Sequence, residues 1–507
     1  MDSLQKPLPR LLPGERITHV ENAGDVADIS IQPSGVHELY RLARAGTIGR
    51  INEFGPVLAS GVLEGHSHPA SLHKYEAIFG RDSLRVVLNL LNSYPKLAHS
   101  TLIRLAELQG VTTDPAREEE PGRIIHEARD PVKDPVARQM TQQRGWGWPY
   151  YGSVDATVEF VRTLAAYCRS QSEGPNFLKA EYVGRDGASH TMADAMIAAV
   201  DWINGRLDAN KEGLLEFRAM NPHGLENQVW KDSWDAYFHA NGEIANHQRG
   251  IASIEVQRVT FDALLDAAEF YDKYFSKSSQ AQELRNRAEK LRLAMMEKFW
   301  TEDRGGYFVL GVDRDPGGSG LRQLQVKTSN MGHMLHSTVL LSGQEPEVVR
   351  RREAIITQLF SPEMLNVSGI RTLATDEYRF RPGSYHNGSV WLWDTYLIAQ
   401  GLDLHGYHGL SYELQKCILG VITTSRQYPE FVRGDDTQTP SLNTQVVDVW
   451  DEKYQRPNRL EQPPQEVQAW TVAAILSMQN SRKVSSLVTS IASQRAFEEK
   501  ILRSLHN

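Results

Sequence analysis

The segment FDALLDAAEFYDKYFSKSSQAQELRNRAEKLRLAMMEKFW, residues 261–300, decides the expected fold. Its apolar residues recur every three or four positions in two successive runs, the spacing that places them on one stripe of an α-helix. Ser279 and Gln282, three residues apart between the runs, are typical of a capping box at the start of the second helix. The segment therefore predicts a helical hairpin. Its two stripes consist of Phe261, Leu264, Leu265, Ala268 and Tyr271, and of Leu284, Ala288, Leu291, Met295 and Phe299.

The same periodicity recurs on both sides of this hairpin. Strand patterns are short, as at 62–63 and 306–309, so we expect an all-α fold. Long stretches rich in Gly, Pro, Trp and Asp separate the helices, and loops of that length are uncommon unless they are functional or disordered. Such stretches run over 110–155, 206–253, 361–390 and 427–465, and helices are expected near 83–94, 156–170, 189–205, 347–360, 389–403, 411–426, 466–480 and 484–504, with weaker helical runs near 97–109 and 327–341.

Composition and charge exclude several classes of protein. The chain carries 55 Lys and Arg against 63 Asp and Glu, a net charge of −8, whereas nucleic acids and anionic membranes attract basic surfaces. No apolar run approaches the ~18 residues needed to span a bilayer, and the N-terminus lacks the apolar core of a signal peptide. Cys168 and Cys417 alone make no disulfide framework. We expect a cytoplasmic protein without a nucleic-acid or membrane partner.

The long loops carry nine short strings that together resemble one family. In this order they resemble the loops of amylo-α-1,6-glucosidases, the glycogen-debranching members of the glucoamylase-like glycoside hydrolases. The resemblance implies an (α/α)6 barrel, a six-hairpin glycosidase fold, that hydrolyses an α-glucosidic bond with inversion. The strings are EAIFGRDSL (76–84), EEPGRIIHE (119–127), YYGSVDAT (150–157), NQVWKDSWDA (227–236), IEVQ (254–257), SNMGH (329–333), SGIRTL (368–373), HNGSVW (386–391) and QAW (468–470).

Two carboxyl groups are expected to carry the chemistry. The resemblance places the general acid at Asp232, and the string YPEFVRG (428–434) resembles the family loop that holds the general base, here Glu430. In an inverting hydrolase the acid protonates the leaving oxygen while the base activates water on the opposite face, with the carboxyl groups about 6.5–9.5 Å apart. Trp230 could limit solvent near Asp232 and keep its pKa raised.

Other interpretations of these two carboxyl groups stay open at this stage. Asp232 could be an exposed loop aspartate or a helix N-cap, with Asp235 as the acid. Glu430 could be a solvated loop glutamate, with Glu466 as the base. The match also departs from the family pattern beyond Phe431, where added charges bring the substrate into question.

The remaining motif residues are candidates for substrate binding. Arg81 and Asp82 are expected to grip the terminal sugar through charge-assisted hydrogen bonds, or else to form a buried ion pair that ties a loop. For the other candidates, structural tethering and sugar contact are about equally expected. These candidates are Glu127, Tyr151, Asp155, Trp230, Glu255, Gln257, Arg371, His386, Asn387 and Trp391.

No metal or cofactor is expected. His66, His68 and His73 form an H-x-H pattern with a third histidine, but no acidic partner pattern accompanies them. We expect one catalytic domain over residues 46–507, preceded by an extension over 1–45.

The substrate is expected to be a small carbohydrate. Only about 75 residues precede the first string, too few for the extra module of the long debranching enzymes. An α-glucoside or a limit dextrin therefore fits the chain as well as branched glycogen does. Two rivals are a phosphorylase of the same fold and a non-catalytic sugar-binding protein. Both carboxyl positions are occupied, which argues against each rival.

Overall fold

The computed structural model describes most of the chain between residues 58 and 506. The predicted extension over 1–45 lies outside the described residues, as do His66, His68, His73 and Glu466. The described residues are 58–61, 75–317, 320–340, 345–425, 427–440, 446–451, 456–461, 465, 467–481 and 492–506.

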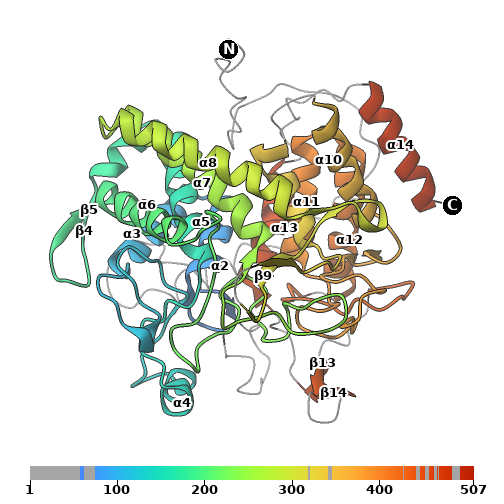
Figure 1. Cartoon of the computed structure of the whole chain (residues 1–507), viewed down its shortest axis with the longest axis horizontal. Coiled ribbons are helices and arrows are strands. Elements are labelled where there is room, and N and C mark those ends of the chain that lie inside the picture. The colour runs from blue at the N-terminus through green and yellow to red at the C-terminus, as the bar shows by residue number, and fades with distance from the viewer. Residues whose placement is uncertain are drawn as a thin grey trace.

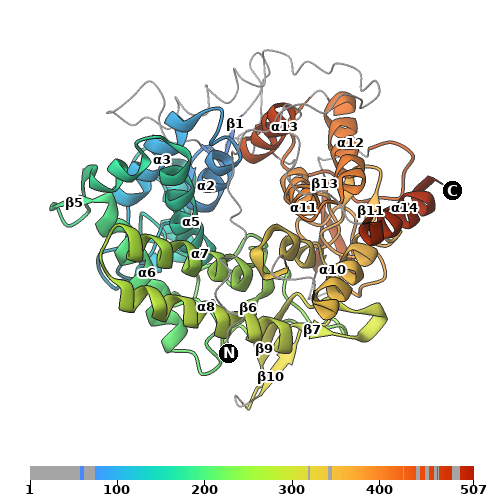
Figure 2. The same ribbon diagram turned by 90° about the horizontal axis from the view of Figure 1, so that it is seen from above.

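An inner ring of helical segments forms the centre of the molecule, seen from above in Figure 2. Each segment packs against the next in chain order, and the last one packs against the first, which closes the ring. The fourth segment, α9, is short and continues as a 3-10 turn. The ring consists of α2 (Gly80–Asn89), α5 (Asp155–Ser170), α7 (Ile254–Lys273), α9 (Asn330–His333) with η5 (Met334–His336), α11 (Leu392–Leu404) and α13 (Ala469–Ser481).

A second layer of helices covers the ring (Figure 1). The outer helices α3, α6, α8, α10 and α12 pack on α2, α5, α7, α9 and α11 respectively, and α14 packs on α12. This alternation of inner and outer helices confirms the predicted all-α, (α/α)6 fold. The outer helices are α3 (Pro95–Glu107), α6 (Met192–Asp208), α8 (Ser278–Lys298), α10 (Pro346–Leu359), α12 (His408–Ser425) and α14 (Ala492–His506), and short 3-10 helices are η2 (Pro115–Arg117), η3 (Gly174–Lys179), η4 (Asp303–Gly305) and η6 (Thr338–Leu340).

The predicted hairpin is formed by α7 and α8, with its apolar stripes turned inward. The predicted capping box is wrong, because α8 begins at Ser278 with Lys277 as its N-cap, so Ser279 lies inside the helix. The weaker helical run expected near 327–341 forms only the short segments α9, η5 and η6. There the chain is broken at Ser337, whose hydroxyl donates to the Asp262 carboxylate (3.0 Å) on α7.

One helix was missed by the periodicity. Helix α4 (Pro135–Arg144) lies in the long loop between α3 and α5, and only Ala137 of it is buried. Its start is fixed locally, since the Asp134 side chain accepts from the backbone N–H groups of Val136 and Ala137. A helix held by its cap and not by a buried stripe leaves no apolar pattern in the sequence.

Short antiparallel strand pairs surround the entrance to the ring at the N-terminal ends of the inner helices. Phe79 pairs with Glu127 just before α2, Ser253 pairs with Gly311 just before α7, and Ser60 pairs with Gln468 just before α13. These pairs fix the loops that carry the sequence motifs. The strands are β1 (Ser60–Gly61), β2 (Ile78–Phe79), β3 (Glu127–Ala128), β4 (Glu181–Val183), β5 (Ser189–Thr191), β6 (Ala252–Ser253), β7 (Trp300–Thr301), β8 (Tyr307–Phe308), β9 (Gly311–Arg314), β10 (Leu321–Gln323), β11 (Leu365–Asn366), β12 (Gly369–Ile370), β13 (Val446–Asp451), β14 (Arg456–Glu461) and β15 (Val467–Gln468).

Within the described part of the chain, every helix is too short or too polar to cross a membrane. Cys168 and Cys417 are both free thiols. The expected cytoplasmic location stays a prediction.

Candidate active site

A single arginine at the start of α2 gathers three carboxyl groups. The Arg81 guanidinium lies 3.3 Å from Asp155 Oδ2, 3.6 Å from Asp82 Oδ2 and 3.5 Å from Asp232 Oδ2. Arg81 and Asp82 are almost fully buried, whereas the Asp232 side chain keeps 25% exposure. Asp232 is therefore the most accessible member of this cluster.

Burial and like charges raise the pKa of Asp232 toward neutrality. Burial raises the pKa of Asp232 from 3.8 to about 7; Arg81 opposes this shift, and Asp82 and Asp155 reinforce it. Burial also raises the pKa of Asp82, to about 6. A carboxyl group with a pKa near neutrality suits a general acid, which must hold a proton at working pH.

The alternatives for Asp232 can now be compared with the structure. Asp232 lies in the loop between α6 and β6 and not at a helix start, so the N-cap interpretation is wrong. The competing Asp235 is buried beside Arg379, which counteracts the rise that burial causes in its pKa. The Asp235 carbonyl oxygen accepts from Asn387 (3.0 Å).

Glu430 is held rigidly within the same region. It is buried, so the interpretation as a solvated loop glutamate is wrong. Its backbone N–H donates to the Gln465 carbonyl (2.9 Å), and the Gln465 N–H donates in turn to Glu430 Oε2 (3.2 Å). The Tyr385 hydroxyl donates to Glu430 Oε1. These contacts orient the carboxylate as a general base requires.

Tyr385 is a contact of Glu430 that the sequence interpretation missed. Burial raises its pKa well above the usual value, and the charges of Glu430, Tyr75 and Asp232 add to the rise. The charges of both expected catalytic groups therefore act on this hydroxyl. Tyr385 directly precedes the string that begins at His386, but nothing in the sequence alone shows that its side chain turns toward Glu430.

Aromatic side chains form a wall beside Asp232. Ring centroids of Trp230 lie 5.1 Å from Trp393 and 5.9 Å from Trp391, and His386 stacks on Trp391 at 5.2 Å. Trp393 stacks on Trp470 at 4.9 Å. Four of these five rings belong to the motif strings, so the motifs meet in one place although they are far apart in the sequence.

Several buried polar atoms next to this wall have no hydrogen-bond partner among the described residues. They are candidates for contacts with sugar hydroxyls, because buried polar groups are normally satisfied. His386 is positioned by Ser233, whose hydroxyl lies 2.9 Å from His386 Nδ1. The atoms without partners are Trp230 Nε1, Glu255 Oε2, His386 Nε2 and Asn387 Oδ1.

The family model of the mannosylglycerate hydrolase MGH1-like glycoside hydrolase domain matches residues 126–432, more than half of the chain. The chain belongs to this glycoside hydrolase family. The resemblance to amylo-α-1,6-glucosidases thus predicted the correct enzyme class and fold, whereas the family that matches is a different one. No curated protein matches the chain.

Solved structures of similar fold come from Thermus thermophilus. Its mannosylglycerate hydrolase in complex with glucose shares 14% identity with this hydrolase at a TM-score of 0.55, covering 88% of this chain and 99% of that one. The same enzyme with Tris and D-glycerate gives 13% identity and a TM-score of 0.56, covering 89% and 99%. At this identity the likeness shows the fold alone.

Three predicted binding residues of this hydrolase act as tethers in the structure. Tyr151 donates to the Leu108 carbonyl (2.6 Å), and the Gln257 amide pairs with both backbone polar groups of Leu215 (2.9 Å each). Arg371 donates to several backbone carbonyls, among them that of Gly434 (2.7 Å). These contacts favour the tethering interpretation over sugar contact for the three residues.

Of the other candidates, Glu127 pairs with Arg129 (3.1 Å), and its charge still influences the pKa of Asp232. Glu255 accepts from the Tyr237 hydroxyl (3.0 Å). No group of three or more possible metal ligands occurs within the described ranges.

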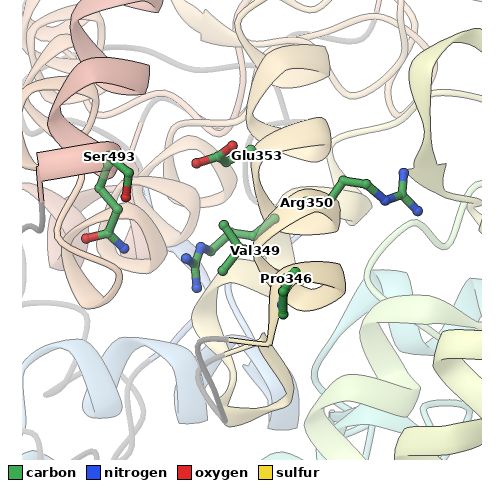
Figure 3. A pocket seen from close by; sticks show the side chains of 7 residues that line it. Pro346, Val349, Arg350, Glu353 and Ser493 are labelled. Atoms are coloured by element: carbon green, nitrogen blue, oxygen red, sulfur yellow. The ribbon is translucent and has the colours of Figure 1, made fainter.

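A separate pocket of about 370 Å³ lies between α10 and the start of α14, in the outer layer (Figure 3). Arg350 points away from the other labelled side chains there and pairs with Glu302 (2.6 Å). This pocket contains none of the motif residues. It is lined by Pro346, Val349, Arg350, Arg352, Glu353, Ser493 and Gln494.

Proposed function

We propose that this hydrolase releases glucose from a neutral α-glucoside by inversion, with Asp232 as the general acid and Glu430 as the general base. The observation that carries the proposal is the Arg81 cluster. It holds the accessible Asp232 and raises its pKa to about 7, while the Tyr385 hydroxyl orients Glu430. Asp232 Oδ2 faces Arg81, which leaves Oδ1 to carry the transferable proton.

The reaction then needs only these two carboxyl groups and water. Asp232 donates its proton to the glycosidic oxygen while the bond to the anomeric carbon breaks. Glu430 removes a proton from a water molecule that attacks the opposite face of that carbon, so the product has inverted configuration. We expect a separation of about 6.5–9.5 Å between the carboxyl groups, the range that leaves room for this water.

The charge of the site favours a neutral substrate. Two cations next to Asp232 among the described residues are already engaged, since Arg81 contacts three carboxyl groups and Lys231 Nζ donates to the Thr372 carbonyl (2.6 Å). An anionic leaving group such as glycerate would meet the repulsion of the remaining carboxylates. Maltose, isomaltose and limit dextrin are therefore the first substrates to try, with mannosylglycerate as the anionic comparison.

Substitution of the two carboxyl groups tests their roles. Asp232→Asn should lower kcat on isomaltose by about 10³-fold or more, but should lower kcat on α-glucosyl fluoride much less, because fluoride leaves with little protonation. Glu430→Gln should slow both substrates alike, because neither leaving group replaces the base. The measurements are kcat and KM of each variant on both substrates.

Asp235→Asn is the matched control and should retain most activity on isomaltose. If Asp232→Asn lost the same factor on both substrates, the assignment of the general acid would be wrong. Release of glucose 1-phosphate in the presence of phosphate would instead identify a phosphorylase. Release of neither product from any glucoside would favour a binding protein.

A further inference from the structure

The loop that carries Asp232 continues into an exposed aromatic ring. Trp230 and Trp234 flank Asp232 at equal distance in sequence, but Trp230 is buried in the aromatic wall, whereas Trp234 is 39% exposed. Leaving a large indole in water forfeits the stabilisation that its burial would provide. This position, two residues after the expected acid, therefore calls for an explanation beyond packing.

A second exposed ring is fixed to the hairpin that follows Trp234. In this hairpin Phe238 pairs with Ile244, and Gly242 at its tip has a φ of +87°. A Cβ atom on Gly242 would lie 2.3 Å from the Tyr378 ring, so the tyrosine rests on the glycine backbone. Arg379 donates to the Gly242 carbonyl (2.8 Å) and holds this arrangement. Tyr378 is 58% exposed.

Both rings are connected to the segment that carries the expected acid: Trp234 lies two residues after Asp232, and Tyr378 is held on the hairpin that follows it. The inner side of Asp232 faces Arg81, which with Asp82 is expected to hold the sugar that is released. A general acid contacts the oxygen shared with the leaving group, so we expect an exposed ring two residues from Asp232 to lie within reach of that group. Asp235 connects the two segments. It follows Trp234 in the chain, and the positive charge of Arg379 acts to lower its pKa.

We propose that Trp234 is a stacking platform for the first sugar ring of the leaving group, and that Tyr378 serves a second ring further out. The inference rests on the proposed function and adds the substrate class: the leaving group is a neutral sugar or oligosaccharide. Aromatic faces bind the apolar faces of sugar rings but offer no charge to a carboxylate. Arg379, the cation beside this surface, already bonds to Gly242 and faces Asp235.

The test compares substrates with and without a sugar leaving group. In Trp234→Ala, the ratio of kcat/KM on isomaltose to kcat/KM on α-glucosyl fluoride should fall about tenfold, a loss typical of an aromatic contact of about 1.4 kcal/mol. Trp234→Phe should restore most of that ratio. Tyr412→Ala removes an equally exposed ring (38%) on the outer helix α12 and should leave the ratio as it is in the wild type.

Substrates of different length distinguish the roles of Trp234 and Tyr378. In Tyr378→Ala, the kcat/KM on isomaltose should stay close to that of the wild type, while the kcat/KM on isomaltotriose should fall severalfold. An unchanged isomaltose-to-fluoride ratio in Trp234→Ala would overturn the platform even though both substrates are hydrolysed. Failure of the wild type to hydrolyse either substrate would instead refute the proposed function, so the two failures are distinguishable.

Discussion

At the scale of single residues, Arg81 sets the protonation of the site. One guanidinium faces the carboxyl groups of Asp82, Asp155 and Asp232, so its charge cannot compensate all three at once. Arg81 and Asp155 act on Asp232 with opposite signs: the first lowers its pKa and the second raises it. The sequence predicted that Arg81 and the three aspartates lie in one pocket. Only the structure shows that all three carboxyl groups contact the same guanidinium.

The pH dependence of hydrolysis should report this balance. The active form of Asp232 is the protonated one, so kcat/KM should fall as pH rises through its pKa of about 7. Asp155→Asn removes a negative charge and should move this alkaline limb to lower pH. Arg81→Gln removes the opposing positive charge and should move the limb to higher pH. The measurement is the pH profile of kcat/KM on isomaltose.

Asp315→Asn, a half-buried position in the β9–β10 hairpin that pairs with Arg322 (3.5 Å), is the control and should leave the limb in place. Shifts of the same sign in Asp155→Asn and Arg81→Gln would contradict the electrostatic account of Asp232.

At the scale of elements, the apolar stripes predicted most of the long helices, since burial of one face is what holds them. The predictions failed where another force decides. Helix α4 depends on its Asp134 cap, and the segment after α9 is broken by hydrogen bonds from Ser337 and Thr338 to Asp262 (3.0 Å each). Hydrogen bonds between segments that are distant in the sequence produce no repeating pattern of apolar residues, so the sequence does not reveal them.

The first residue of α2 should be intolerant of a side chain. A Cβ on Gly80 would lie 2.2 Å from the Ile125 carbonyl oxygen, so Gly80→Ala must displace the helix that carries Arg81 and Asp82. We expect a loss of about 2 kcal/mol or more in stability and a marked fall in kcat. The measurements are urea unfolding and isomaltose hydrolysis.

Gly205→Ala in α6 is the matched control. Open space surrounds its Cβ position, and alanine should stabilise the helix there by about 0.5–1 kcal/mol without change in kcat. Equal stability of both variants would show that the close approach of Gly80 to the Ile125 carbonyl oxygen does not exclude a side chain at position 80.

At the scale of the whole molecule, closure of the ring brings the motifs together. Short strand pairs at the entrance join segments hundreds of residues apart, such as Ser60 with Gln468, and thereby seat Gln465 against Glu430. The motif order indicated that these loops share one end of a barrel. The role of Tyr385 could not be predicted, because it depends on which loops become neighbours when the ring closes.

The central claim is that Asp232 and Glu430 act from opposite faces of the anomeric carbon. The most direct test follows the hydrolysis of an α-glucoside by the wild-type enzyme with proton NMR, before the released glucose mutarotates. Inversion predicts that the β-anomer of glucose appears first and that the α-anomer grows in only later. First appearance of the α-anomer would show retention, and would contradict the assignment of Glu430 as a base that activates water.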